Sequence, residues 1–287
     1  MLKGDLSFNP QRTYIVNETS FFRDMGTVEY EKNYFEKNLS NKPDINIVIG
    51  GCSTGEDVWT QKMFLNDVDG VNVLGFDLSN EAIKKAEGGH YTIRNTDFFT
   101  NIYDAYADYY LAFDGENPLT QKQLKYRSLF KDFFREVKYP DMYPSKPSVL
   151  DGGERKYFVI RTEKNSVPFI QENVLRMQKF IRHGVDAFIF KNSLYHLTTY
   201  DLEHELQNIR PENELKNILN DFTDNVKAIV CKNGLFVLGA HEKDHKEPVK
   251  TILYGLLEKG GFEPAFMEDG MVTVWKKAGQ SLLRFFK

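Results

Sequence analysis

The stretch INIVIGGCSTGED, residues 45–57, decides the fold of this 287-residue chain. An apolar run at 45–50 leads into a glycine-bracketed loop, and a helix-like segment follows. This order of strand, glycine loop and helix is typical of nucleotide-binding α/β proteins. The gap between Gly50 and Gly55 matches a phosphate-binding P-loop, but Glu56 stands where such a loop needs its lysine. A nucleotide-dependent enzyme with a degenerate P-loop is therefore disfavoured.

The acidic residues that end this loop indicate the kind of ligand. Glu56 and Asp57 suit the positive end of a helix dipole, yet they repel a phosphate. We therefore expect a ligand that is cationic or rich in hydroxyl groups, and Gly50 and Gly51 would admit close approach of the backbone to it. The alternative, in which the glycines are only turn residues, stays open.

Further runs of the sequence predict the rest of the fold. β-rich runs lie at 71–76, 167–172, 185–190 and 234–239, and helix-like stretches lie at 54–67, 80–87 and 200–222. Nearly continuous apolar runs are typical of parallel strands covered on both faces. Near the C-terminal end FEPAFM and MVTVWKK flank EDG, which predicts a hairpin. We predict an α/β fold: a Rossmann-like, seven-stranded, mainly parallel sheet closed by an antiparallel C-terminal hairpin.

Residues 96–165 interrupt this alternation and predict a helical or irregular insertion. The segment from about 120 to 138 is predicted as an amphipathic helix, because its apolar residues recur at helical spacing. These residues are Tyr126, Phe130, Phe133 and Val137. A helix packed on its own domain and a lid that faces a partner or substrate both fit the pattern.

The composition limits the class of protein. The chain has 41 acidic and 37 basic residues and a net charge of −4, so we expect no binding of nucleic acid through overall charge. Cys52 and Cys231 lie far apart without zinc-binding spacing, and no metal site is predicted. No apolar run approaches the ~20 residues that span a bilayer, and no signal segment is visible. We expect a cytoplasmic protein without membrane insertion; its oligomeric state is left undefined.

Two further groups of residues complete a candidate site. Asp77 ends the second strand about 20 residues beyond the loop, where nucleoside-binding folds place an acid that accepts hydrogen bonds from ribose hydroxyls; a helix cap is the alternative. In NETSFFRD, 17–24, Arg23 could bind a carboxylate while Asn17 and Thr19 meet an adenosyl group. A helix cap with buried phenylalanines also fits this stretch. These donors and acceptors match S-adenosylmethionine. This molecule has a sulfonium, an ammonium, a carboxylate and a ribose diol, but no phosphate.

Six blocks of the sequence resemble, in order and in wording, the chemotaxis receptor methyltransferases of CheR type. The blocks are VNETSFFRD, GGCSTGED, VLGFDLSNEAIKKAEGGHYT, VPFIQENVL, DAFIFKNSLYHL and GLFVLGAHE, within about 14–95 and 157–242. The resemblance implies a class I methyltransferase fold with S-adenosylmethionine as cofactor. It also implies cofactor-binding roles for Asn17, Thr19, Arg23, Glu56, Asp77, Asn173 and Asn192.

The resemblance divides the chain into a short N-terminal segment, 1–40, and a methyltransferase domain, 41–287, with the insertion at about 96–165. Two departures concern the methyl acceptor. The family has a basic helical domain ahead of this site, which meets the receptor, whereas only sixteen residues precede Asn17 here. In KNSLYHL, Lys191 and His196 stand where the family has arginine and tyrosine. We therefore expect an acceptor other than a chemotaxis receptor.

The expected reaction needs few catalytic groups. Methyl transfer from a sulfonium to a carboxylate depends on alignment and desolvation rather than on a general base, so Arg23 is assigned to positioning. For a hydroxyl or amine acceptor, His196 is the candidate base, with a structurally satisfied histidine as the alternative. We predict a methyltransferase that acts on a carboxylate or other oxygen acceptor of a protein or small molecule. A cofactor-binding sensor or interaction module without turnover stays open.

Overall fold

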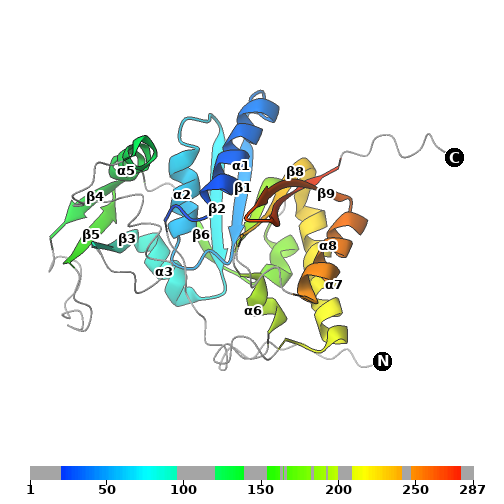
Figure 1. Cartoon of the computed structure of the whole chain (residues 1–287). Coiled ribbons are helices and arrows are strands. Elements are labelled where there is room, and N and C mark those ends of the chain that lie inside the picture. Colours follow the sequence, from blue (N-terminus) through cyan, green and yellow to red (C-terminus); the bar gives the residue numbers. More distant parts are fainter. Residues whose placement is uncertain are drawn as a thin grey trace.

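A seven-stranded sheet forms the centre of the protein (Figure 1). The computed structural model describes residues 21–95, 120–138, 154–161, 164, 167–181, 184–191, 193–199, 209–240 and 247–278. The strand order is β6-β2-β1-β7-β8-β10-β9, and only the pairs made by β10 are antiparallel. The strands are β1 (Ile45–Gly50), β2 (Val71–Asp77), β6 (Phe169–Gln171), β7 (Val185–Phe190), β8 (Val230–Leu238), β9 (Phe262–Glu268) and β10 (Met271–Lys277). This confirms the predicted Rossmann-like sheet with an antiparallel hairpin at its edge.

The hairpin turns at the predicted Asp-Gly pair. Asp269 and Gly270 both have positive φ, 50° and 78°, as a two-residue type I′ turn requires. Because β10 is antiparallel to both β8 and β9, β9 runs in the same direction as β8 and the other parallel strands. Glu268, the last residue of β9, therefore lies at the carboxyl edge of the sheet, where α/β proteins bind their ligands.

Helices cover both faces of the sheet (Figure 1). One face packs against α1 (Met25–Asn38), α2 (Glu56–Phe64) and α3 (Asn80–Gly88). The other packs against the 3-10 helix η2 (Val174–Lys179), α6 (Leu194–Thr198), α7 (Glu212–Ile229) and α8 (Val249–Lys259). The chain thus forms three layers with a separate hydrophobic core on each side of the sheet.

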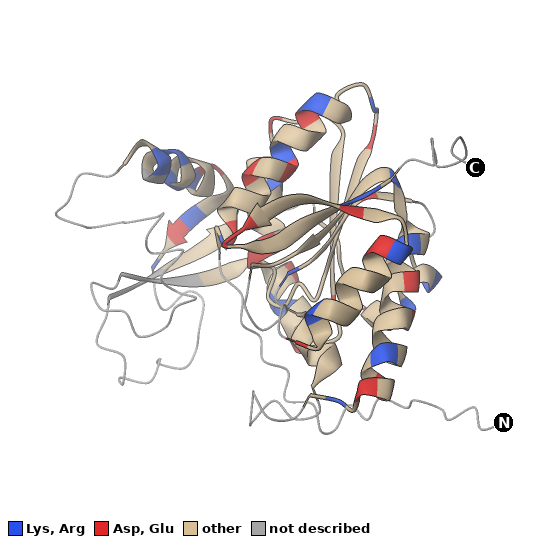
Figure 2. Ribbon diagram, turned by 45° about the vertical axis from the view of Figure 1, so that its right-hand side comes forward, with Lys and Arg blue, Asp and Glu red and all other residues tan. Residues whose placement is uncertain are grey.

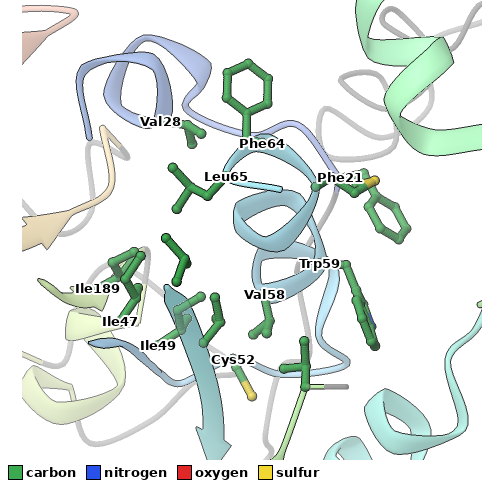
Figure 3. Close-up of a cluster of buried hydrophobic side chains, with 14 of the residues drawn as sticks. Phe21, Val28, Ile47, Ile49, Cys52, Val58, Trp59, Phe64, Leu65 and Ile189 are labelled. Carbon is green, nitrogen blue, oxygen red and sulfur yellow. The ribbon is translucent and has the colours of Figure 1, made fainter. Parts of the chain in front are cut away.

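Strand β1 supplies both cores. Ile47 and Ile49 pack with Val58 and Trp59 of α2 in the first core (Figure 3). Val48, between the two isoleucines, belongs to the second core. Since successive residues of a strand point to opposite faces, both sets must be apolar. This explains why the run 45–50 shows no alternation with polar residues.

A small antiparallel sheet lies beside α2 and α3 (Figure 1). Its order is β3-β5-β4, from β3 (His90–Asn95), β4 (Phe134–Val137) and β5 (Glu154–Ile160). Helix α5 (Gln121–Phe133) precedes β4 directly. Phe21, from the segment ahead of α1, packs edge to face against Tyr91, Phe130 and Phe134. Aromatic contacts of this kind join the small sheet and α5 to the main fold.

The amphipathic helix expected at about 120–138 is confirmed in part. Tyr126, Phe130 and Phe133 are buried on α5, as their spacing predicts. The helix ends at Phe133, however, and Val137 lies in β4, so its assignment to the helix is wrong. Residues 134–137 pair with β5, and this non-local pairing overrides the local helical period.

The helix expected at 200–222 also differs from the structure. Residues 200–208 lie outside the described part of the chain, and α7 begins at Glu212, directly after Pro211. A proline disfavours the α conformation of the residue before it, so a helix across Arg210 and Pro211 is wrong. Helices α1 and α8 and the three strands of the small sheet were not predicted from the sequence.

Charged residues are distributed over the helices (Figure 2). On α7 the pair Lys216–Glu212 has i,i+4 spacing, and the helix carries both acidic and basic residues. On α5 the exposed charges are mainly basic, as Lys122, Lys125 and Lys131 show. No helix in the described residues is long and apolar enough to cross a membrane.

The segment ahead of α1 is anchored on α2. The Phe22 N–H donates to Thr60 Oγ1 at 3.0 Å, and the Phe22 ring stacks on Tyr126 with centroids 5.3 Å apart. Phe22 and Asp24 have φ of 59° and 49°, in the left-handed region that bulky residues rarely adopt. Such a turn persists only when surrounding contacts outweigh its strain.

We expect Thr60→Val to lower the free energy of unfolding by about 1–3 kcal/mol, because it leaves the buried Phe22 N–H without an acceptor. Thr223→Val is the matched control. Thr223 is also buried on a helix and also bonds the carbonyl four residues earlier, but among the described residues no backbone N–H donates to it. Thr223→Val should lower the free energy of unfolding by about 1 kcal/mol or less. Urea unfolding measures both, and equal losses would contradict the anchoring role of Thr60.

Candidate active site

The carboxyl ends of β1, β2 and β7 lie side by side, and predicted site residues follow them. Gly50 ends β1 and Asp77 ends β2. Lys191 follows the last residue of β7. The pairings β2-β1-β7 place these three ends next to one another. The structure thus brings together residues that are up to about 140 positions apart in the sequence.

Asp77 joins the loops that follow β1 and β2. Its Oδ2 accepts the N–H of Ser53 and its Oδ1 accepts the N–H of Ser79, both at 2.8 Å. Ser79 itself caps α3, because its Oγ accepts the Ala82 N–H. Burial raises the pKa of Asp77, and the two backbone N–H groups oppose this shift. Each carboxylate oxygen keeps a second acceptor position, so the predicted bonds to ribose hydroxyls stay a prediction.

The protein's own packing requires the glycines of the first loop. A Cβ on Gly50 would lie 2.7 Å from the Phe76 ring, and one on Gly51 would lie 2.6 Å from Ser193 Oγ. Gly51 and Gly55 also have positive φ, 62° and 93°. These contacts account for the glycines without a ligand. Close approach of Gly50 and Gly51 to a cofactor therefore remains a prediction.

Ser193 joins the loop after β7 to the glycine loop. Its Oγ lies 3.4 Å from the Gly51 carbonyl oxygen and 3.1 Å from that of Lys191. His196 follows on α6; its N–H donates to the Ser193 carbonyl, and its half-buried ring lies 3.9 Å from the Tyr195 ring, centroid to centroid. Ser193 was not predicted, because only the fold brings it to Gly51.

Arg23 reaches the site through the anchored N-terminal segment. It is 8% exposed and follows Phe22, which is bound to Thr60. Thr60 Oγ1 in turn donates to the carbonyl of Glu56, the first residue of α2. The backbone of Arg23 therefore lies near the first turns of α2, and its role at the cofactor stays a prediction. The predicted residues Asn17, Thr19 and Asn192 lie outside the described part of the chain.

Glu56 and Asn173 occupy the two sides of the site. Thr54 Oγ1 donates to Glu56 Oε2 at 2.6 Å, which holds this half-buried carboxylate at the end of the glycine loop. Asn173 follows β6 and its Oδ1 accepts the Leu175 N–H, so it caps η2. The neighbouring Glu172 N–H donates to the Asp77 carbonyl. Both predicted residues thus lie at the carboxyl edge.

A buried cluster of charges connects α1, α2 and the end of β7. Lys191 Nζ lies 3.3 Å from Asp57 Oδ1. Glu31, fully buried on α1, accepts from Gln61 Nε2 at 2.8 Å, and its Oε1 has no hydrogen-bond partner among the described residues. Burial lowers the pKa of Lys191, but Asp57 and Glu31 outweigh it and the net shift is upward. Burial raises the pKa of Glu31 to about 8, with Lys191 opposing.

This cluster was not predicted, because its members lie on three separate elements. The sequence gives one indication of the cluster, which is the charged residue Lys191 directly after the apolar run of β7. A buried charge is costly when it loses its partner. The ion pair of Lys191 with Asp57 therefore keeps the first turn of α2 next to the end of β7. The described residues contain no group of His, Cys, Asp and Glu side chains that could hold a metal ion.

The donors and acceptors at this edge fit S-adenosylmethionine. Glu56 and Asp77 place carboxylates at this edge, where they can pair with cationic and hydroxyl groups; the pairing of Arg23 with a carboxylate stays a prediction. The fold is the seven-stranded, mainly parallel α/β arrangement expected of a class I methyltransferase. Residues 17–133 match the family model described as the SAM binding domain of CheR methyltransferase. This match confirms the predicted resemblance over that part of the chain, and S-adenosylmethionine is the cofactor that it indicates.

Several solved structures are similar to this chain at low identity, whereas no curated protein matches the sequence. The DszA carbon methyltransferase is 11% identical, with a TM-score of 0.42 over 88% of this chain and 52% of that one. An O-methyltransferase family protein from Burkholderia thailandensis is 9% identical, with a TM-score of 0.39 over 88% and 55%. A putative rRNA-methylase from Clostridium thermocellum is 14% identical, with a TM-score of 0.37 over 90% and 96%. This chain thus spans about half the length of the first two.

The pH dependence of stability tests the buried cluster. Glu31 has an ordinary pKa of 4.5 and a pKa of about 8 in the folded protein. Between these values the folded state holds a proton that the unfolded state has lost, so the free energy of unfolding falls as the pH rises through this window. Glu31→Gln removes the titration, and its free energy of unfolding should rise relative to wild type from pH 5 to pH 9.

Urea unfolding at pH 5, 7 and 9 measures this difference. Glu36→Gln is the control, because Glu36 lies on the same helix with its side chain exposed. Its difference from wild type should stay constant across the three pH values. An equally constant difference for Glu31→Gln would contradict a protonated Glu31 in the folded protein.

Proposed function

We propose that this protein is an S-adenosylmethionine-dependent methyltransferase that acts on a carboxylate or other oxygen acceptor. One observation carries the proposal: Asp77 holds the glycine loop by its Ser53 N–H at the carboxyl edge of β1 and β2, within the residues that match the CheR cofactor-binding domain. Bound S-adenosylmethionine supplies a methyl group on a sulfonium. In this proposal residues 41–287 form the methyltransferase domain, with an insertion at about 96–165, and residues 1–40 contribute to the cofactor site.

The chain's own residues bind and orient the reactants. Asp77 accepts hydrogen bonds from the ribose hydroxyls, and Glu56 compensates positive charge on the cofactor. Arg23 orients the cofactor carboxylate or an anionic acceptor through its planar guanidinium. The further cofactor-binding residues of the proposal are Gly50, Gly51, Asn17, Thr19, Asn173 and Asn192. The rate then depends on alignment and on exclusion of water.

The acceptor follows from the chemistry of the transfer. A carboxylate is already an anionic nucleophile, so it needs no base, and charge is neutralised as the methyl group moves to it. Lys191 and His196 depart from the pattern of the receptor methyltransferases, which supports an acceptor other than a chemotaxis receptor. The net charge of −4 supports a protein or small molecule rather than a nucleic acid. If the acceptor is a hydroxyl, His196 of α6, the helix that follows β7, is the base.

Calorimetry with Asp77→Asn tests the cofactor site. The change keeps the shape of the side chain but removes its charge, and we expect the affinity for S-adenosylmethionine to fall by roughly 1.5–3 kcal/mol. Asp186→Asn is the matched control. Asp186 is also buried and also accepts a backbone N–H, from Asn46 at 2.9 Å, but it lies near the opposite, amino edge of the sheet. Unchanged affinity in a folded Asp77→Asn protein would argue against the ribose assignment.

Arg23→Lys tests the positioning role of the guanidinium. Lysine keeps the charge and loses the fork geometry that pairs with a carboxylate. We expect the affinity for S-adenosylmethionine, or kcat/KM for transfer, to fall about tenfold or more. Arg135→Lys, whose side chain is exposed on β4, should leave both unchanged. Wild-type values for Arg23→Lys would rule out the proposed role.

A screen with methyl-labelled S-adenosylmethionine tests the acceptor. Small carboxylic acids, lysate proteins, receptor cytoplasmic fragments and RNA are offered separately. We expect base-labile label, typical of a methyl ester, on a carboxylic acid or a protein. Label on RNA or on receptor glutamates would overturn the proposed acceptor class. Cofactor binding without transfer to any of them would identify a sensor or interaction module instead.

A further inference from the structure

Helix α1 begins without a cap from its own neighbours. Asp24, at the N-cap position, makes no side-chain hydrogen bond to the helix, and the first turn contains no acidic residue. Glu268, at the end of β9, fills this role. Its Oε1 accepts the Gly26 N–H at 3.0 Å, and its Oε2 accepts the Thr27 N–H at 3.1 Å and the Thr27 hydroxyl at 2.6 Å. A carboxylate here satisfies two free N–H groups and complements the helix dipole.

The contact between Glu268 and α1 is closely fitted. A Cβ on Gly26 would lie 2.5 Å from Glu268 Oε1, so a side chain at this position would displace the carboxylate. Thr27 Oγ1 also lies 2.9 Å from Thr273 Oγ1 of β10. One turn further along α1, Tyr30 stacks on Phe266 of β9 with centroids 4.9 Å apart. The first turns of α1 are thus fixed to the C-terminal hairpin.

The capped turn directly follows Arg23. Phe22 and Asp24, on either side of Arg23, both have left-handed backbone conformations. The Phe22 N–H is bound on one side to Thr60, and the first turn of α1 is bound on the other side to Glu268. Since strained residues keep their conformation only when the structure holds them there, both anchors are needed to hold Arg23 in place.

We propose that Glu268 is a positioning residue of the cofactor site, which acts on cofactor binding through Arg23. The inference rests on the proposed function, because it assigns Glu268 to the orientation of a residue that binds the cofactor. Without the carboxylate, the Gly26 and Thr27 N–H groups lose their acceptor and the turn at 22–24 relaxes. The hairpin that closes the sheet thereby contributes to a site formed mainly by parallel strands.

Two variants and a control test this role by calorimetry with S-adenosylmethionine. Glu268→Ala should raise Kd about fivefold to thirtyfold, which is the effect of losing a helix cap with charge-assisted hydrogen bonds. Glu268→Gln keeps one acceptor oxygen and should have a smaller effect. Glu263→Ala is the control on the same strand; its side chain is exposed, 4.0 Å from Lys276, and Kd should stay at the wild-type value. If Glu268→Ala does not fold, Glu268→Gln and Thr27→Val take its place.

A mutant cycle separates positioning from a general loss of stability. In an Arg23→Ala background, Glu268→Ala should no longer change Kd, because the residue through which it acts is gone. Hydrogen exchange of the amides at 22–27 should increase in Glu268→Ala at temperatures where the rest of the protein stays protected. An undiminished effect of Glu268→Ala in the Arg23→Ala background would overturn the inference.

The Asp77→Asn variant distinguishes a failure of the role proposed for Glu268 from a failure of the proposed function. If wild type binds S-adenosylmethionine and Asp77→Asn weakens binding while Glu268→Ala does not, the role of Glu268 is overturned and the proposed function stands. If wild type binds no S-adenosylmethionine, the proposed function is overturned together with the inference. If Asp77→Asn and Glu268→Ala both weaken binding, and Glu268→Ala has no effect in the Arg23→Ala background, the results support the proposed function and the role of Glu268.

Discussion

The arrangement of the site depends on the carboxylate of Asp77, which accepts the N–H groups of Ser53 and Ser79 at the same time. Ser53 lies in a loop that contains three residues of positive φ, at positions 51, 53 and 55. Asp77 fixes this loop against β2 and leaves acceptor positions free toward the carboxyl edge. One side chain therefore has both a structural role and a proposed binding role, and its replacement alters both.

The fold was largely predictable because its central strands follow local rules. The run 45–50 is apolar throughout since β1 serves two cores, and Asp269-Gly270 forms the turn that its residue types favour. Errors occurred where a non-local contact overrides a local period. The late start of α7, directly after Pro211, is an exception, because the effect of a proline on the residue before it is local and visible in the sequence. Residues 134–137 continue the apolar pattern of α5 but pair with β5 instead. Element boundaries in such places depend on tertiary pairing that one sequence does not show.

The candidate site was predictable where its residues lie in short motifs, and not where they meet across the fold. Gly50, Glu56 and Asp77 belong to a strand-loop-helix-strand unit with recognisable spacing, and the structure places them at one edge. Lys191, Asp57 and Glu31 form a buried cluster from β7, α2 and α1, and no spacing in the sequence relates them. Lys191 keeps a cation at a position where the resembling family has arginine, and the carboxylate of Asp57 beside it explains why a cation is needed.

The cap on α1 also sets an order of assembly. Gly26 and Glu268 are separated by 242 positions, and at the usual rates of protein synthesis roughly 10–50 s pass between the production of the two residues. During that interval the first turn of α1 has only water as an acceptor, while β1, β2 and α2 are already available to fold. The turn that carries Arg23 is thus completed by β9, which is made more than two hundred residues later, so a nascent chain can hold this turn in its final form only after β9 has emerged from the ribosome.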